Sequence, residues 1–154
     1  MVTLPTSGRW CFIDVSSKDN DLFSGQGRYS TLQGFDALLG ARNVRACLSP
    51  LHSEVKTLIW AMKCMNNLRQ FQVTSATDCS QLVKMVSEPE ERPAFGIYLE
   101  DIKILKRSFL NSDIVHVLRT ENLRADSLAR SVRKQPFFVV HMDAELPIWF
   151  TEST

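Results

Sequence analysis

Three strand-like runs precede the first helical segment, and this order limits the chain to folds that begin with an antiparallel unit. The runs cover residues 10–15, 25–32 and 35–47, and Gln33-Gly34 forms a hairpin turn between the second run and the third. Short connections of this kind join antiparallel neighbours, because a parallel pair needs a longer crossover. The sequence therefore predicts three leading antiparallel strands.

Strands and helices alternate in the rest of the chain. Ser49 and Pro50 suit a helix start, as N-cap and first helical residue, and an apolar stripe at helical spacing follows over 51–65. The further elements are a strand at 71–76, helices at 81–86 and 95–109, a strand at 114–119 and a helix at 121–132, with turns at 88–93 and 111–113. This alternation predicts an α/β fold with a five-stranded mixed sheet flanked by helices.

Composition limits the class of protein but not its partner. A length of 154 residues suits one domain, and 44% hydrophobic with 23% charged residues is typical of a soluble globular chain. The net charge of +1 neither requires nor excludes nucleic acid. The four cysteines form no CxxC pair, which favours reduced thiols in an intracellular protein of the nucleus or cytoplasm. No secretory signal, membrane-spanning stretch or nucleotide-binding glycine motif is visible.

Four carboxylates stand in apolar or small-residue surroundings, namely Asp14, Glu54, Asp78 and Asp126. Two belong to strands or their ends, and two lie near predicted helix starts. Strand ends and the helix starts that follow them gather at one edge of an open α/β sheet, so we expect the acids to converge. Carboxylate oxygens are ligands for hard cations such as Mg²⁺ and Mn²⁺. For any single acid, an unrelated role as a turn former, a surface residue or a helix-start residue is equally open.

The motifs that carry these acids resemble the type 1 ribonuclease H family. They are Asp14-Val-Ser-Ser, Ser49-Pro-Leu-His-Ser-Glu54, Ala76-Thr-Asp78-Cys-Ser and Asn122-Leu-Arg-Ala-Asp126-Ser-Leu-Ala129. More closely, the chain is similar to the plant reverse-transcriptase-like branch found in non-LTR retroelements and their domesticated relatives. The resemblance implies a ribonuclease H-like domain over 10–135, an N-terminal extension over 1–9 and a C-terminal arm over 136–154.

The resemblance also implies an activity, which is metal-dependent cleavage of the RNA strand of RNA–DNA hybrids. Two Mg²⁺ ions, or Mn²⁺ as a substitute, would be held by the four acids. Asp14 would bridge both ions, Glu54 and Asp78 would hold the ion nearer the leaving group, and Asp126 would complete the ion that activates water. The implied partner is an RNA–DNA hybrid. We expect a monomer, acting alone or linked to other domains of a polyprotein.

Five residues are predicted to contact nucleic acid, namely Ser16, Gly27, Arg119, Asn122 and Arg124. Gly27 belongs to a Gly-x-Gly element that either admits the substrate backbone or forms a simple bend. The two arginines, together with Arg130, Arg133 and Lys134, are candidates for phosphate contacts, and a solvated basic face is an equal alternative.

Two departures from the family pattern keep a second function open. The loop that would carry a mobile histidine is only Thr120-Glu121, and His116 falls in the preceding strand, where packing against the sheet is the simpler interpretation. The acidic loop Glu88-Pro-Glu-Glu91 replaces a basic protrusion and would repel phosphate, or is a plain solvated turn. The alternative function is a catalytically weak or inactive ribonuclease H-like module that binds nucleic acid or protein.

Overall fold

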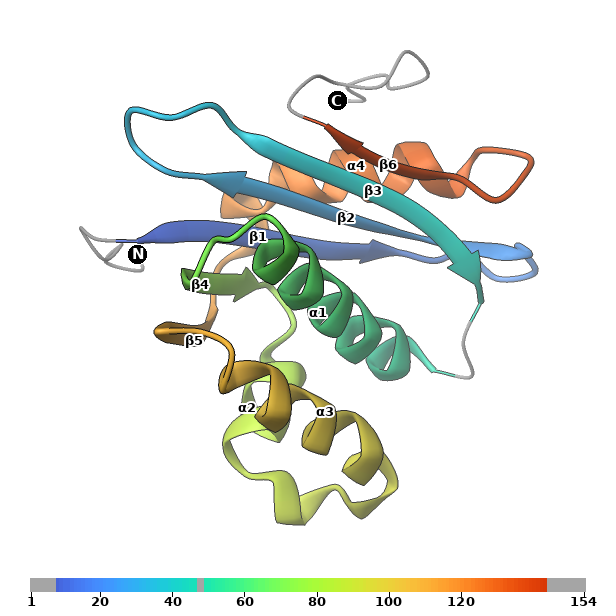
Figure 1. Cartoon of the computed structure of the whole chain (residues 1–154). Coiled ribbons are helices and arrows are strands. Elements are labelled where there is room, and N and C mark those ends of the chain that lie inside the picture. Colours follow the sequence, from blue (N-terminus) through green and yellow to red (C-terminus); the bar gives the residue numbers. More distant parts are fainter. Residues whose placement is uncertain (1–7, 47–48, 144–154) are drawn as a thin grey trace.

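A six-stranded mixed sheet forms the framework of the structure (Figure 1). The computed structural model describes residues 8–46 and 49–143, with side chains as far as residue 141. The strands are β1 (Arg9–Ser16), β2 (Phe23–Thr31), β3 (Leu38–Arg45), β4 (Gln72–Thr77), β5 (Asn111–His116) and β6 (Val140–Asp143). They lie side by side in the order β5-β4-β1-β2-β3-β6.

The pairing directions follow the prediction. Strands β1, β2 and β3 form an antiparallel unit, whereas β4 runs parallel to both β1 and β5. Because β1 and β4 are parallel neighbours, their carboxyl ends meet at the same edge of the sheet. Asp14 lies near the end of β1 and Asp78 directly follows β4, so the topology alone brings these two acids together.

The sheet has a sixth strand, so the predicted count of five is wrong. Strand β6 lies in the segment predicted as a C-terminal arm, and it pairs antiparallel with β3. The buried amide of Asn43 secures this segment: its Nδ2 donates to the Phe137 carbonyl over 2.8 Å, and its Oδ1 accepts from the Val139 N–H over 2.7 Å. The spacing of residues within one segment does not predict hydrogen bonds to a segment so far away in the sequence. The rest of the predicted arm lies outside the described residues.

Strands β5 and β3 also differ from their predicted boundaries. Residues 111–113 begin β5 instead of forming a turn, because pairing with β4 already starts at Asn111, opposite Gln72. Strand β5 then ends at His116, and a 3₁₀ turn over Arg119–Glu121 leads into the last helix. The predicted third strand shortens to β3, and its predicted end at Cys47 lies outside the described residues.

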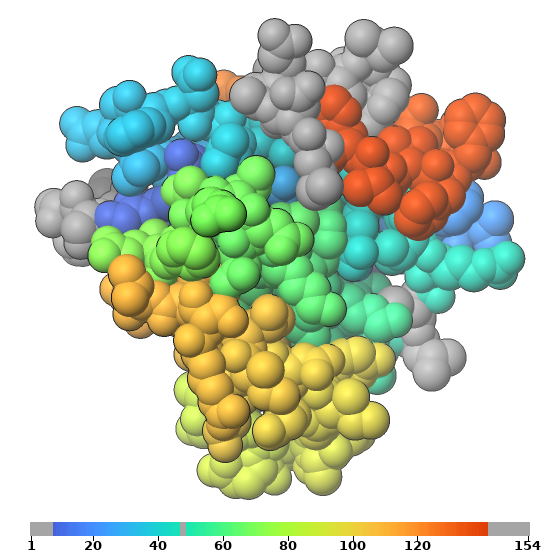
Figure 2. Space-filling model, viewed as in Figure 1, coloured from blue at the N-terminus to red at the C-terminus, as the bar shows by residue number. Residues whose placement is uncertain are grey.

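Over the described part of the chain the helices are α1 (Pro50–Asn67), α2 (Ser80–Ser87), α3 (Gly96–Lys106) and α4 (Leu123–Arg133). Ser49 caps α1 as predicted, since its Oγ accepts a hydrogen bond from the His52 N–H over 3.2 Å. Helix α1 packs on one face of the sheet and α4 covers the opposite face (Figure 1). Helices α2 and α3 form the lower lobe in Figure 2. None of these four helices combines the length and the apolar character needed to cross a membrane.

Close packing of α4 on β2 depends on two glycines. A Cβ atom at Gly25 would overlap the carbonyl oxygen of Ala129, and one at Gly27 would overlap the carbonyl oxygen of Ala125. Both obstacles are backbone atoms, which cannot rotate away as a side chain can. The Gly-x-Gly element of β2 therefore admits a helix of the same chain, whereas we predicted that it admits the substrate backbone or forms a bend.

Candidate metal centre

Asp14 places a carboxylate at the centre of the sheet. It lies opposite Gly27 in the register of β1 and β2, and therefore on the face that α4 covers. Only 6% of the residue is exposed. Its Oδ1 accepts a hydrogen bond from the Val15 N–H over 2.9 Å, which orients the carboxylate. A buried acid with so little hydrogen bonding favours binding of a cation.

Glu54 and Asp78 approach Asp14 from two other elements. Glu54 lies in the second turn of α1, and its Oε2 is buried without a hydrogen-bond partner. Asp78 follows the last residue of β4, where the Cys79 N–H donates to the Oγ1 of Thr77 over 3.0 Å and starts α2. One carboxylate oxygen from each of the three acids lies within 4.8 Å of the others. We call Asp14, Glu54 and Asp78 the acidic triad.

The electrostatics of the acidic triad oppose full ionisation. Burial, and then the negative charge of Asp78, raise the pKa of Asp14 to about 8, with smaller contributions from Glu54 and Asp126. Burial and the charge of Asp78 likewise raise the pKa of Glu54 to about 7. Clustered carboxylates shift in this way when nearby positive charge is insufficient. A divalent cation would supply that charge, and the all-oxygen ligands suit a hard ion.

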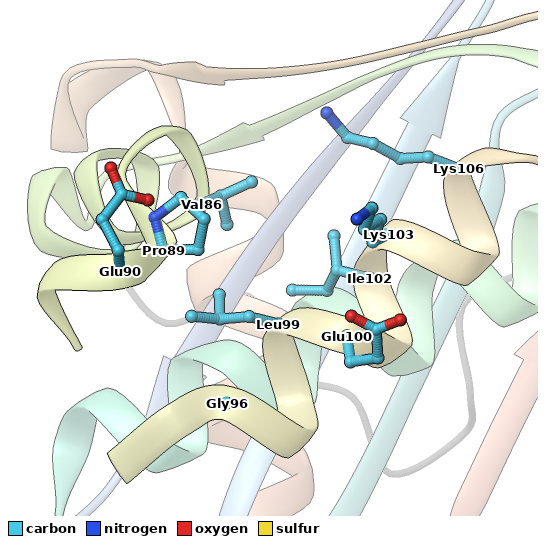
Figure 3. Close-up of a pocket in the computed structure, with 9 residues that line it drawn as sticks. All are labelled: Val86, Pro89, Glu90, Gly96, Leu99, Glu100, Ile102, Lys103 and Lys106. Carbon is cyan, nitrogen blue, oxygen red and sulfur yellow. The ribbon is translucent and has the colours of Figure 1, made fainter. Parts of the chain in front are cut away.

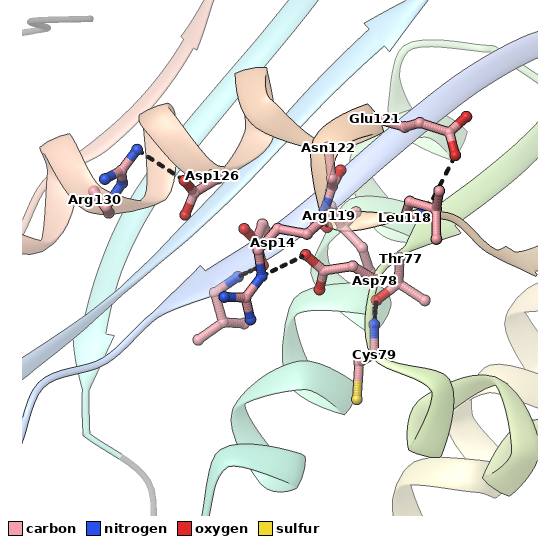
Figure 4. A network of polar contacts seen from close by, with 12 residues as sticks. Asp14, Thr77, Asp78, Cys79, Leu118, Arg119, Glu121, Asn122, Asp126 and Arg130 are labelled. Atoms are coloured by element: carbon pink, nitrogen blue, oxygen red, sulfur yellow. Dashed lines mark hydrogen bonds and ion pairs between the residues drawn. The ribbon is translucent and has the colours of Figure 1, made fainter. Parts of the chain in front are cut away.

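Asp126 lies beside the acidic triad rather than within it. It sits in the first turn of α4, and its Oδ2 forms an ion pair with Arg130 over 2.8 Å (Figure 4). Its charge still contributes to the raised pKa of Asp14, so the two carboxylates are close enough to interact. The structure thus brings three of the four predicted acids together and holds the fourth at the margin through Arg130.

Two of the predicted nucleic-acid contacts lie after β5, in very different surroundings (Figure 4). The side chain of Arg119 is 87% exposed, and its Nε lies 3.9 Å from the Oδ2 of Asp78. Asn122 is 1% exposed, and its Nδ2 donates to the Ile13 carbonyl over 2.8 Å. Arg119 is therefore accessible to a ligand beside the acidic triad, whereas Asn122 ties the start of α4 to β1.

The other three predicted contacts also separate by exposure. Gly27 is buried beneath α4. The Oγ of half-buried Ser16 accepts a hydrogen bond from the Nε of Arg133 over 3.0 Å. Arg124 is exposed on α4, with its guanidinium 5.5 Å from the ring centre of Tyr29. Among the five, Arg119 and Arg124 are thus the residues that present their side chains to solvent.

Two arginines predicted as phosphate contacts have partners within the chain. Arg130 pairs with Asp126, and Arg133 pairs with Asp21 over 2.6 Å. The first pair is visible in the sequence, because an acid and a base four residues apart lie on the same side of a helix. We did not predict it. The second joins α4 to the loop after β1, and no local pattern predicts it.

The described histidines lie outside the acidic triad. His116 ends β5 as a strand residue, as predicted, but it is exposed instead of packed against the sheet. His52 stacks on Phe95 with ring centres 4.4 Å apart, and its Nδ1 lies 2.6 Å from the Oγ of Ser49.

A separate hollow of about 470 Å³ lies between α2 and α3 (Figure 3). Val86, Leu99 and Ile102 give it an apolar lining. Its charged lining residues balance, and they are Glu90, Glu100, Lys103 and Lys106. None of the four predicted acids lines this hollow, so it is distinct from the candidate metal centre.

Three solved structures with the same fold are ribonucleases H. The chain superposes on ribonuclease H1 of the archaeon Halobacterium salinarum with a TM-score of 0.71 and 19% identity, covering 80% of this chain and 96% of that one. LC11 ribonuclease H1 in complex with an RNA/DNA hybrid superposes with a TM-score of 0.69 and 18% identity, covering 79% of this chain and 94% of that one. The N-terminal ribonuclease H domain of rv2228c from Mycobacterium tuberculosis superposes with a TM-score of 0.70 and 19% identity, covering 82% of this chain and 94% of that one. At these identities the likeness defines the fold.

The fold and the acidic triad together define a ribonuclease H-like α/β domain. Within this class, the chain belongs to the reverse transcriptase-like family, whose sequence profile matches residues 32–132. The matched range holds Glu54, Asp78 and Asp126, while Asp14 precedes it. A comparison with curated protein sequences finds no match.

Proposed function

We propose that this protein is a metal-dependent ribonuclease that cuts the RNA strand of RNA–DNA hybrids. The observation that carries the proposal is the acidic triad, three carboxylates from β1, α1 and the end of β4 within 4.8 Å of one another. A similar fold has been solved with an RNA/DNA hybrid bound, in LC11 ribonuclease H1. That complex supports a hybrid as the substrate class.

Each acid has a role that follows from its position. Asp14, the most buried of the acidic triad, would hold Mg²⁺ or Mn²⁺ together with Glu54 and Asp78. Asp126 would supply a ligand for a second ion, once its carboxylate leaves Arg130. When bound, two such ions stabilise the attacking and leaving oxygens of a phosphodiester displacement.

Exposed arginines would position the substrate. Arg119 lies beside the acidic triad and Arg124 is the second residue of α4, and both present guanidinium groups to solvent. Guanidinium groups recognise phosphate oxygens through paired hydrogen bonds. Contacts of this kind read the shape and backbone of a duplex rather than its sequence.

The ion pair between Asp126 and Arg130 supports a second candidate function. It occupies the fourth acid and adds a positive charge near the place where a second cation would bind. On this alternative, the domain binds nucleic acid or protein but cuts poorly or not at all. Binding would then persist in EDTA and after substitution of the acids.

Cleavage of a labelled RNA–DNA hybrid separates the two functions. The wild-type protein should cut the RNA strand in Mg²⁺ and in Mn²⁺, and the Asp14→Asn variant should not. Asp113→Asn is a matched control, because Asp113 is an exposed acid on β5 outside the acidic triad. A folded wild-type protein that binds the hybrid but cuts it in neither metal would exclude the nuclease and support the binding module.

A further inference from the structure

The face of β2 turned toward α1 is polar where a core is expected. Its side chains alternate along the strand as Ser24, Gln26, Arg28 and Ser30, and each is at most 1% exposed. Arg28 lies opposite Ile13 in the strand register, and Ile13 belongs to the core beneath α1. Asp14, the next residue along β1, points to the opposite face, so the sheet lies between its carboxylate and Arg28.

Within the described part of the chain, Arg28 is a buried cation without a compensating anion. Its Nε and Nη1 atoms are buried and form no hydrogen bond. Among the residues that the structure describes, no carboxylate forms an ion pair with it. Burial raises the pKa of the nearby Cys11 thiol to about 12, so no thiolate balances the charge. Charges are seldom buried without a partner, so this arrangement points to an anion supplied from outside.

A second guanidinium joins the first around one aromatic ring. The Cζ of Arg28 lies 5.7 Å from the ring centre of Trp60 on α1, and that of Arg42 lies 4.9 Å from the same ring. Arg42 is only half-buried, so a ligand in solvent can reach its guanidinium group. Cation–π contacts orient the planar guanidinium groups without neutralising them.

The side chains around Arg28 leave further donors free. The Nε of Arg42 donates to the Oε1 of Gln26 over 2.6 Å, which leaves the buried Nε2 of Gln26 as a donor without a partner. Gly40, opposite Arg28 in the register, provides the room for its side chain, because a Cβ there would lie 2.5 Å from the Arg28 Nε. The unpaired atoms on Arg28 and Gln26 are all N–H donors, which suits an acceptor with several oxygens.

We propose that Arg28, Arg42 and Gln26 form a phosphate-binding site on the α1 face of the sheet, separate from the acidic triad. Two guanidinium groups supply two positive charges, which match a phosphate better than a single carboxylate. Free phosphate and a phosphate group of a nucleotide share this chemistry. The site binds without divalent metal, so its test does not depend on nuclease activity.

Thermal unfolding with inorganic phosphate tests the site, in EDTA and against sodium chloride at matched ionic strength. At ten times the dissociation constant, phosphate should raise the Tm of the wild-type protein by roughly 3–5 °C. The increase should be lost in Arg28→Met and in Arg42→Met. It should remain in Arg45→Met, because Arg45 is an exposed arginine on the same strand as Arg42.

Titration calorimetry then separates the possible ligands. Binding of phosphate with one site per chain, and weaker binding of acetate, would support the proposal. A nucleoside monophosphate that binds more tightly than phosphate would identify a nucleotide as the source. If phosphate raises the Tm no more than chloride does, or raises it equally in Arg42→Met, there is no such site. Arg42→Met keeps the test valid if Arg28→Met fails to fold, since Arg42 is only half-buried.

Discussion

The side-chain amide of Asn122 donates a hydrogen bond to the main-chain carbonyl of Ile13 over 2.8 Å. This bond joins the residue before α4 to the residue before Asp14, and it is buried. Asp126 follows four residues after Asn122, on the first turn of the same helix. The bond therefore fixes the position of Asp126 relative to Asp14, which lie on segments far apart in the sequence.

Replacing Asn122 with alanine should lower both stability and activity. The substitution leaves the Ile13 carbonyl buried without its donor, which costs about 1–3 kcal/mol of unfolding free energy. Hybrid cleavage should fall through kcat more than through KM, since the acids shift while exposed substrate contacts remain. Urea unfolding and steady-state kinetics measure the two effects. Asn67→Ala is the control, at an exposed position at the end of α1. A stability equal to wild type would show that the bond does not hold α4 in place.

Alanine at Gly27 should destabilise the protein by forcing α4 away from β2. The added Cβ would overlap the Ala125 carbonyl oxygen, and overpacking of this kind costs about 1–3 kcal/mol or more. Gly96→Ala is a matched control, for which we expect a change in stability of the opposite sign. Gly96 has helical dihedral angles and open space around it, so alanine there should stabilise by about 0.4–1 kcal/mol. Chemical denaturation of the two variants gives the comparison, and equal effects would contradict the packing role of Gly27.

The elements that the sequence predicted correctly are those that depend on interactions between neighbouring residues. Ser49 and Pro50 mark the start of α1 through capping chemistry that involves only neighbouring residues. The order of strands and helices likewise follows from spacing along the chain, and the parallel pairing of β1 with β4 follows from that order. The order of the elements is therefore sufficient to predict that Asp14 and Asp78 lie together.

Contacts between distant segments were not predicted, because they leave no pattern in the sequence of either segment. Strand β6 depends on Asn43, which lies more than ninety residues before the segment that it holds. The role of Gly27 depends on α4, which begins almost a hundred residues later in the sequence. The pair of Asp126 and Arg130 is different, because its spacing of four residues was visible. There the family resemblance assigned the acid to a metal ion, and the nearer partner was overlooked.

Substitution of Arg119 should affect substrate binding without affecting the fold. The side chain is 87% exposed and 3.9 Å from Asp78, and surface pairs of this kind contribute little to stability. Arg119→Ala should keep its unfolding free energy within about 0.5 kcal/mol of wild type and weaken hybrid binding severalfold. Filter binding in EDTA measures the affinity. Arg107→Ala is the control, as an exposed arginine at the end of α3. If both variants bind the hybrid equally well, Arg119 does not contact it.

Without divalent metal, stability should fall as the pH rises from about 4 to about 8. The folded-state pKa values of Asp14 and Glu54 are raised to about 8 and about 7, above their usual values of 3.8 and 4.5. Between these limits the folded protein holds more protons than the unfolded chain, so raising the pH favours unfolding. The slope is at most about 1.4 kcal/mol per pH unit for each proton. Urea unfolding in EDTA should show a shallower slope for Asp14→Asn and an unchanged slope for Asp113→Asn. A wild-type stability that rises over this range would contradict the raised values.

Divalent cations should reverse this loss, and their effect should distinguish Asp126 from Asp14 and Asp78. At pH 8, near the raised pKa of Asp14, a cation competes with the proton for this carboxylate. Mg²⁺ or Mn²⁺ that binds the folded state should therefore raise the Tm with increasing concentration. Asp14→Asn and Asp78→Asn each remove a ligand from the acidic triad and should abolish the increase. Asp126→Asn should keep most of it, because the acidic triad remains to hold one cation. Differential scanning fluorimetry over a metal titration measures all four proteins together. If Asp126→Asn loses the response as fully as Asp14→Asn does, then metal binding at the acidic triad needs Asp126 as well, and the acidic triad does not hold a cation without it.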